Sequence, residues 1–136
     1  MKKGKQSVLC VLLLLVLAGT ALITFDPQVK AEKFVARWGK QIEEGIASGN
    51  GIPAGAGDHM GNDYMIEFTL SARGFGSQTS YYGCYYSYED VPFAYGFAEV
   101  ELIPAGNDRW TWQEEGDNHG LTEKIRDHWY YFEAYF

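Results

Sequence analysis

Cysteine is scarce in this chain, and the two that occur cannot form a disulfide within one domain. Cys10 lies within an apolar run near the N-terminus, so Cys84 is alone in the remaining sequence. A single thiol forms no internal disulfide, whichever compartment the chain reaches. We expect Cys84 to be a half-buried strand residue rather than a reactive nucleophile, because the sequence points to no base beside it.

Basic residues are also few once the first 25 residues are set aside. Residues 26–136 contain 8 Lys and Arg against 18 Asp and Glu, a net charge of −10. Such a charge repels the phosphates of nucleic acids and of anionic lipid headgroups. A nucleic acid is therefore not expected as a partner.

The sequence lacks the motifs of the common metal and catalytic sites. It has no EF-hand spacing, no HExxH and no paired CxxC, and it contains only three His. His119 near Asp117 and His128 beside Asp127 are the available acid–base pairs, but close neighbours on a strand or helix tend to point apart. We favour a non-catalytic protein and expect no cofactor.

The most prominent feature present is a long apolar run. Residues 8–25 carry no charge and follow the basic start MKKGKQ. A helix of this length spans roughly 27 Å, close to the hydrocarbon thickness of a membrane, which indicates a retained single-pass anchor. The other interpretation is a secretory signal cleaved near Ala31. Both place residues 26–136 outside the cell membrane as a single extracytoplasmic domain.

An amphipathic helix is predicted from Pro27 to about Ser48. Asp26 suits the N-cap, Pro27 the first helical position and Gly49 the C-terminal cap. A helix that begins here would contain the cleavage site, which favours the anchor. Apolar residues recur at three- and four-residue spacing and form one buried stripe: Ala31, Phe34, Val35, Trp38, Ile42 and Ile46.

The segment after this helix, residues 49–63, is rich in Gly and has no apolar period. Loops of this length are uncommon without a role, which makes Asp58 and His59 a possible ligand pair. Two adjacent polar residues cannot form a metal site alone, so a solvated loop is the favoured interpretation.

Period-two alternation predicts strands over residues 64–71, 79–88, 97–104, 109–115 and 129–136, with the first two paired as a hairpin. A short helix is predicted over residues 121–128, where Leu121 and Ile125 are the apolar pair. The result is an α+β fold: a transmembrane or signal helix, then an amphipathic helix packed on a four- to five-stranded, mostly antiparallel sheet. This order of elements is similar to that of cystatin-like and small NTF2-like domains.

The stretch WTWQEEGDNHG, residues 110–120, admits two interpretations. In the structural one, Trp110 and Trp112 cover the helix stripe led by Phe34 and Trp38, and Asn118 caps the short helix. In the other, four polar residues form a binding site for Ca²⁺ or a polar ligand: Glu114, Asp117, Asn118 and His119. Asp117 and His119 are the candidate metal ligands within it.

Aromatic residues suggest a further kind of site. An exposed aromatic strip on the second face of the sheet would suit a cell-envelope glycan, formed by Tyr81, Tyr85, Trp129, Tyr131 and Tyr135. Trp129 and Tyr131 therefore join the candidate ligand-binding residues. The favoured alternative leaves these rings half-buried with their hydroxyls in water.

Residues 110–136, with GDNHG and the ending TEKIRDHWYYFEAYF, together with the basic-apolar start, resemble a group of small uncharacterised bacterial proteins that carry an N-terminal membrane segment. The resemblance implies a location and no activity. We expect a membrane-tethered or secreted envelope protein that acts as a binding or interaction module for a glycan or a protein. The alternative is a small hydrolase or metal-dependent enzyme using His119 with Asp117 and Glu114, with His59 as a further polar group.

Overall fold

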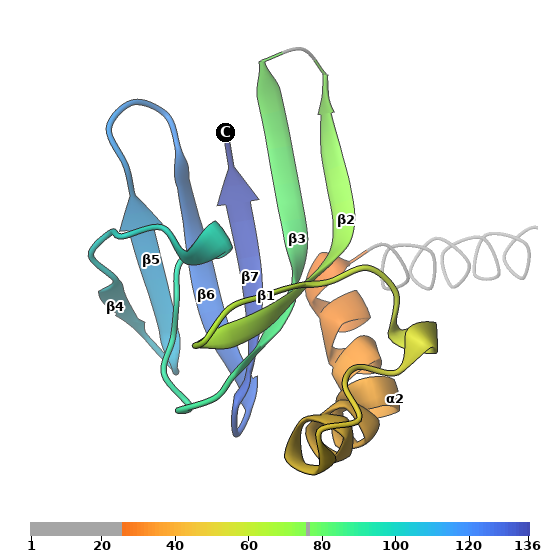
Figure 1. Ribbon diagram of the computed structural model, residues 1–136. Helices are drawn as coiled ribbons and strands as arrows, with labels where there is room; N and C mark the ends of the chain where they lie inside the picture. Colours follow the sequence, from red (N-terminus) through yellow and green to blue (C-terminus); the bar gives the residue numbers. More distant parts are fainter. Residues whose placement is uncertain (1–25, 76) are drawn as a thin grey trace, which may run out of the picture.

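The computed structural model describes residues 26–75 and 77–136, which contain one α-helix followed by a seven-stranded antiparallel sheet (Figure 1). The α+β fold and the antiparallel sheet are thus confirmed, with more strands than the four or five expected. The helix is α2 (Pro27–Ser48), and the 3-10 helices are η1 (Ala54–Ala56) and η2 (Tyr95–Phe97). The strands are β1 (Met60–Gly61), β2 (Met65–Phe75), β3 (Gln78–Ser87), β4 (Ile103–Gly106), β5 (Arg109–Gln113), β6 (His119–Arg126) and β7 (Trp129–Tyr135).

The predicted anchor or signal, residues 1–25, lies outside the described residues. In the described ranges, no helix combines the length and apolarity that a membrane span requires.

Helix α2 has the bounds and caps expected from the sequence. The Asp26 side chain accepts hydrogen bonds from the amides of Gln28 and Val29, at 2.9 and 3.5 Å. Gly49 adopts a left-handed φ of 74°, which Gly accepts without strain, and its N–H donates to the Ile46 carbonyl. The buried stripe of α2 lies against the sheet.

The sheet runs in the order β1-β2-β3-β7-β6-β5-β4, which places the aromatic strand β7 in its middle. The predicted hairpin of β2 and β3 is confirmed, and β2 is longer than expected because pairing continues from Gly74 with Thr79 to Phe75 with Gln78. Its tip projects beyond the neighbouring strands (Figure 1), and Phe75 there is 97% exposed.

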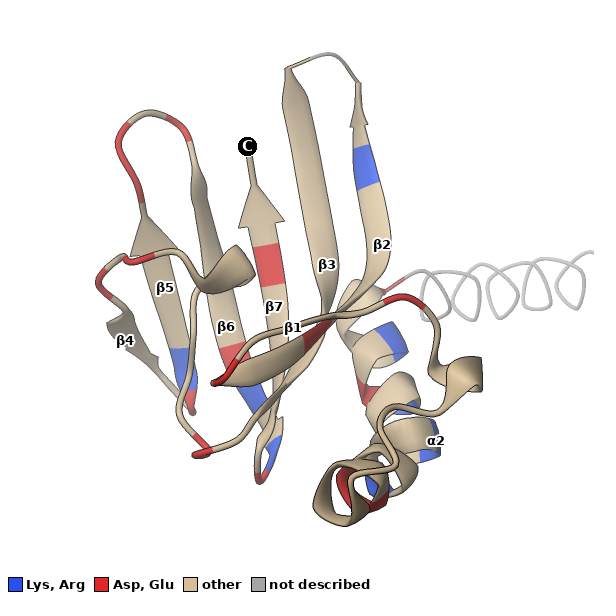
Figure 2. Ribbon diagram, viewed as in Figure 1, with Lys and Arg blue, Asp and Glu red and all other residues tan. Residues whose placement is uncertain are grey.

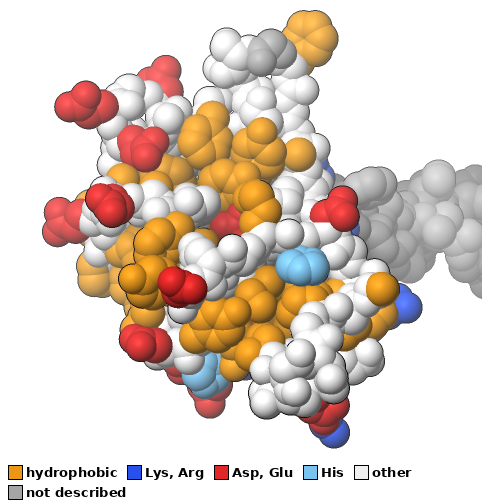
Figure 3. All heavy atoms as spheres, in the orientation of Figure 1, with side chains coloured by type: hydrophobic (Ala, Val, Ile, Leu, Met, Phe, Trp, Pro, Cys, Tyr) orange, Lys and Arg blue, Asp and Glu red, His pale blue; other side chains and the backbone are white. Residues whose placement is uncertain are grey.

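Both faces of the sheet are covered, although only the helical cover was expected. On one face α2 packs against Phe68, Cys84 and Trp129. On the other face the connection from β3 to β4, residues 89–102, crosses the sheet and contributes Phe93, Ala94, Tyr95, Val100 and Leu102 to two further clusters. Figure 3 shows this second face: hydrophobic side chains gather in its middle, and an acidic side chain is recessed among them.

The prediction that Trp110 and Trp112 cover the helix stripe is wrong. Trp112 packs with Ala94 and Ala134, and Trp110 packs against the cluster around Tyr130. The register explains this: Trp110 pairs with Thr122, and Thr122 pairs with Phe132 on the face opposite α2. Both Trp side chains therefore belong to the second core, the clusters between the sheet and residues 89–102.

Two predicted elements are also wrong. Residues 121–128 form most of β6 and its turn into β7 instead of a helix, so Asn118 caps no helix. A separation of four residues, as between Leu121 and Ile125, fits one helical turn and also two steps of strand alternation. The strand expected over residues 97–104 begins only at Ile103, because the residues before it pack onto the sheet without joining its ladder.

Candidate functional site

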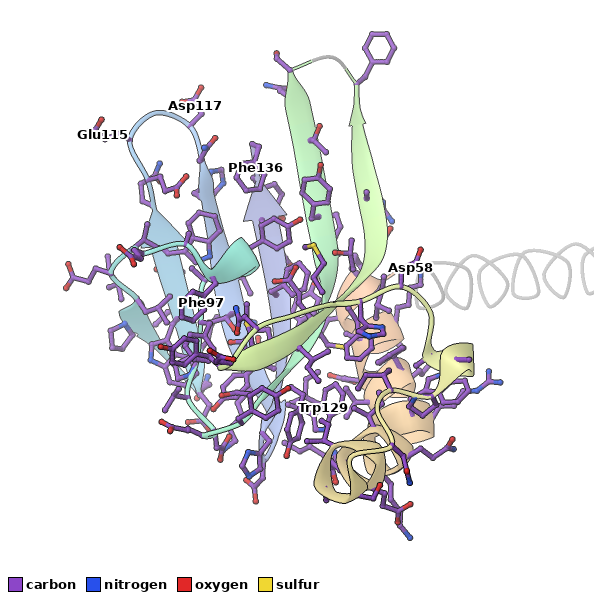
Figure 4. All side chains as sticks on the ribbon, in the orientation of Figure 1. Asp58, Phe97, Glu115, Asp117, Trp129 and Phe136 are labelled. Carbon is purple, nitrogen blue, oxygen red and sulfur yellow. The ribbon has the colours of Figure 1, made fainter. Side chains whose placement is uncertain are left out.

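A groove opens where the central strand β7 ends between two longer hairpins. The β2–β3 hairpin lies on one side and the β5–β6 hairpin on the other (Figure 1). The cavity between them measures about 840 Å³. It is lined by Ser77, Gln78, Ser80, Gln113, Glu115, Gly116, Asp117, Asn118, His119, Tyr135 and Phe136. Figure 4 shows Glu115 and Asp117 on the loop between β5 and β6, and Phe136 at the end of β7.

The β5–β6 loop is held in shape by its own hydrogen bonds. The Glu114 amide donates to the Asn118 carbonyl at 2.9 Å, which closes the loop. The Gln113 side-chain amide lies within 3.0–3.3 Å of the carbonyls of Glu114, Gly116 and Asn118. Asn118 Nδ2 donates to Glu114 Oε2 at 3.1 Å. Glu114 and Asn118 therefore order the loop that presents Glu115 and Asp117 to solvent.

An aromatic pair forms part of the groove wall. The His119 ring stacks on Tyr135, with ring centroids 4.9 Å apart and an interplanar angle of 14°. His119 Nδ1 donates to the Asp117 carbonyl at 2.7 Å, which fixes the ring plane. Burial and the Glu133 carboxylate, which accepts from the Tyr135 hydroxyl, raise the pKa of Tyr135, so the phenol stays neutral at physiological pH.

The rim of the groove is polar and acidic. Ser77, Gln78 and Ser80 supply hydroxyl and amide groups from the β2–β3 hairpin, and Glu115 and Asp117 supply carboxylates from the opposite loop. In Figure 2 the loop between β5 and β6 and the connection before β4 carry acidic residues, whereas basic residues gather on α2. The groove can therefore donate and accept hydrogen bonds around a ligand, and it repels anions.

Three of the six predicted ligand-binding residues meet in this groove: Asp117, Asn118 and His119. Glu114 lies beside it and is bonded to Asn118. Trp129 and Tyr131, at 0% and 1% exposure, are buried under α2 instead.

The prediction of an exposed aromatic strip is therefore wrong. Its members lie on opposite faces because the register pairs Tyr85 with Tyr130 and Tyr81 with Ala134, so odd positions of β3 share a face with even positions of β7. Tyr85, 1% exposed, belongs to the second core, and Trp129 and Tyr131 belong to the core under α2. Only Tyr135 of this set lines the groove.

Among the described residues, neither His59 nor His128 lines the groove that holds His119. His59 lines a different cavity, together with Asp58, Met60, Glu67 and Thr69. His128 stacks on Tyr86 and its Nδ1 donates to the Ser87 carbonyl at 2.8 Å, a structural contact. Over residues 26–75 and 77–136, no group of three or more His, Cys, Asp or Glu side chains is placed to hold a metal ion.

Sequence reasoning missed one polar residue, Glu67 on β2, which alternation placed on an open face. Glu67 is only 3% exposed because residues 89–102 cover that face. Its Oε2 accepts from the Gly96 amide at 3.1 Å, and burial raises the pKa of its carboxyl group. The available signal was the apolar sequence PFAYGF at residues 92–97, which is too hydrophobic for a solvated loop.

Comparisons with protein family models, with curated proteins and with solved structures find no match to this chain.

Proposed function

We propose that residues 26–136 form a non-catalytic binding module of the bacterial envelope, and that the groove between the two hairpins binds a neutral, hydroxyl-rich ligand such as an envelope oligosaccharide. One observation carries this proposal: Asp117, Asn118 and His119 meet Tyr135 and the hydroxyl and amide groups of the β2–β3 hairpin around one groove. Its volume, about 840 Å³, lies within the usual range of roughly 300–1,000 Å³ for ligand pockets.

The chemistry of the groove suits a sugar better than a lipid or an anion. The apolar faces of sugar rings pack on aromatic rings such as Tyr135, while carboxylate, amide and hydroxyl groups bond to sugar hydroxyls. The acidic rim disfavours phosphate and sulfate. Hydrogen bonds already hold the β5–β6 loop in place, so a ligand would lose little free energy to loop ordering.

We further propose that the N-terminal segment is retained as a single-pass membrane anchor with the domain outside. Ala31 is fully buried in the second turn of α2. Cleavage after Ala31 would remove the Asp26 cap and leave a charged amino group beside the core, which is costly. Mass spectrometry of the protein from the membrane fraction should therefore give the full-length chain, and a mature chain beginning at Glu32 would reject the anchor. We retain the cystatin-like or small NTF2-like arrangement as a proposal about element order only.

The glycan proposal is tested by thermal unfolding of the full-length chain in detergent with a soluble oligomer of N-acetylglucosamine. At about 100 times its dissociation constant, a ligand stabilises the fold by about 2.7 kcal/mol. We expect the unfolding midpoint to rise for the wild type and for the control His59→Ala, whose exposed ring lies outside the groove. His119→Ala should lose the rise. No rise for the wild type, or an equal rise in His119→Ala, would reject this groove as a glycan site.

A further inference from the structure

The buried carboxylate of Glu67 lies between two small cavities at the β1 edge of the sheet. One measures about 180 Å³ and is lined by Met60, Gly61, Asn62, Met65, Glu67 and Gly96. The other measures about 280 Å³, and Glu67 and Met60 also line it. The register places Glu67 directly opposite Met60 on one side and Tyr85 on the other, so these side chains share a face.

One of the two carboxylate oxygens is left without a protein partner. Oε2 accepts from the Gly96 amide, whereas Oε1 is fully buried and has no hydrogen-bond partner among the described residues. Buried carboxylates in folded proteins nearly always have partners, because an unpaired one loses its hydration without compensation. Glu67 lines both cavities, and a hydrogen-bond donor from outside the described residues would complete the bonding of its carboxylate.

Within residues 26–75 and 77–136, no Lys or Arg side chain lines either cavity. The titratable side chains around Glu67 are Tyr85 on β3 and Tyr95 on η2, together with Asp58 and His59, which line the neighbouring cavity. Several basic side chains of the sheet form ion pairs with other carboxylates: Lys124 with Asp90, Arg109 with Glu123 and Arg126 with Glu43. The charge of Glu67 is thus open to a cation from outside the chain.

We propose that Glu67 anchors the ammonium group of a small aliphatic amine, held in the 180 Å³ cavity with its carbon chain against Met60 and Met65. An ammonium group donates hydrogen bonds, which matches the unpaired acceptor, and its alkyl chain suits thioether walls. The volume admits a ligand of a few non-hydrogen atoms, since a water molecule in the liquid occupies about 30 Å³. Asp58 at the neighbouring cavity and the net charge of −10 favour the approach of a cation.

A metal ion fits this place less well. A metal needs several ligands in defined geometry, and the described residues offer no group of three His, Cys, Asp or Glu side chains for one. Two thioethers would suit only a soft ion such as Ag⁺ or Cu⁺. An alkylammonium ion pairs with one charged acceptor and packs its carbon chain on an apolar wall, and the cavity offers Glu67 and the two Met side chains for these contacts.

The test titrates the full-length chain in detergent with n-butylammonium chloride and, separately, with the neutral n-butanol. We expect a saturable rise in the unfolding midpoint with the ammonium salt and none with the alcohol. Glu67→Gln should abolish the rise. Glu101→Gln, which removes the same charge from an exposed position, should keep it.

A second measurement needs no variant. The side-chain carboxyl ¹³C resonance of Glu67 in the wild type reports its pKa, and bound ammonium should lower that pKa whereas the alcohol should leave it unchanged. The proposal is wrong if the ammonium salt neither stabilises the wild type nor lowers this pKa, or if Glu67→Gln responds as the wild type does. Stabilisation by Ag⁺ alone would overturn it in favour of a soft-metal site. None of these results depends on glycan binding in the other groove.

Discussion

At the scale of single residues, Asp90 shows how one carboxylate connects three parts of the chain. Its side chain accepts from Lys124 Nζ at 2.7 Å, from the His128 amide at 2.8 Å and from the Tyr130 hydroxyl at 3.0 Å. Burial opposes the charge, but these hydrogen bonds outweigh it and lower the pKa of Asp90 to about 2. The start of the covering connection is thereby bound to the β6–β7 turn.

Asp90→Asn should lower the free energy of unfolding by about 1–3 kcal/mol at pH 7, because it removes charge-assisted hydrogen bonds. Asn tolerates the left-handed φ of 55° found at this position, so the change isolates the charge. The wild-type contribution is complete above the unfolded pKa of about 3.9 and is lost as pH falls towards 2. Urea unfolding between pH 2 and 7 measures it. Asp127→Asn, an 88% exposed partner of Lys124, is the control and should change stability little.

Glu67 should show the opposite pH dependence. Because burial raises its folded pKa, the stability gained by protonation is complete below the unfolded value of about 4.3 and is lost as pH rises through the folded pKa. Glu67→Gln should therefore unfold at higher urea concentration than the wild type at pH 8 and at a similar concentration at pH 4. Equal midpoints at pH 8 would mean that Glu67 carries no desolvation cost.

At the scale of elements, the local sequence predicted the correct secondary structure wherever the spacing of apolar residues fitted only one kind of element. The cap residues and the stripe of α2 leave no alternative to a helix, and β2 and β3 alternate over enough residues to specify a hairpin. In β6 the spacing of Leu121 and Ile125 fits both a helix and a strand. Hydrogen bonding to β5 and β7 makes this segment a strand. That pairing depends on residues distant in the chain, which a local pattern does not contain.

Gly120 lies at a close approach between β6 and its neighbours. A Cβ atom there would lie 2.2 Å from the Glu133 carbonyl oxygen and 2.5 Å from the Trp112 ring. Gly120→Ala should therefore destabilise the fold by about 1–3 kcal/mol through overpacking. Gly61→Ala on β1, whose nearest contact would be 3.6 Å, is the matched control and should be close to neutral. Similar urea midpoints for both variants would show that β6 and Trp112 can move apart freely.

At the scale of the whole molecule, two covers on one sheet explain what the sequence could and could not predict about the site. GDNHG was recognisable as a polar turn, and four of its residues, Gly116 to His119, line the groove. Their neighbours Ser77, Gln78 and Tyr135 come from other hairpins and are brought there by sheet order. Glu67 was missed for a related reason, since its burial depends on a connection that pairs with no strand.

The same architecture predicts a gradient of stability across the sheet. β7 pairs with strands on both sides and its first four residues are buried. β4 is an edge strand whose four residues are exposed, and its Pro104 lacks an N–H. Native-state hydrogen exchange should therefore give the Tyr131 and Phe132 amides an opening free energy equal to that of global unfolding. The Ala105 amide should exchange through local fraying at a much lower free energy.

Asp90→Asn tests this gradient further, because the variant should lower the free energy of global unfolding and leave the local opening of β4 unchanged. The variant should reduce protection of the Tyr131 and Phe132 amides by the same free energy that urea unfolding reports. The exchange of Ala105 should be unchanged, because β4 contacts neither Asp90 nor its partners in the ladder. A loss of protection shared equally by Ala105 would mean that the edge strand unfolds with the core. Unchanged protection of β7 would mean that the covering connection opens without exposing the sheet beneath it.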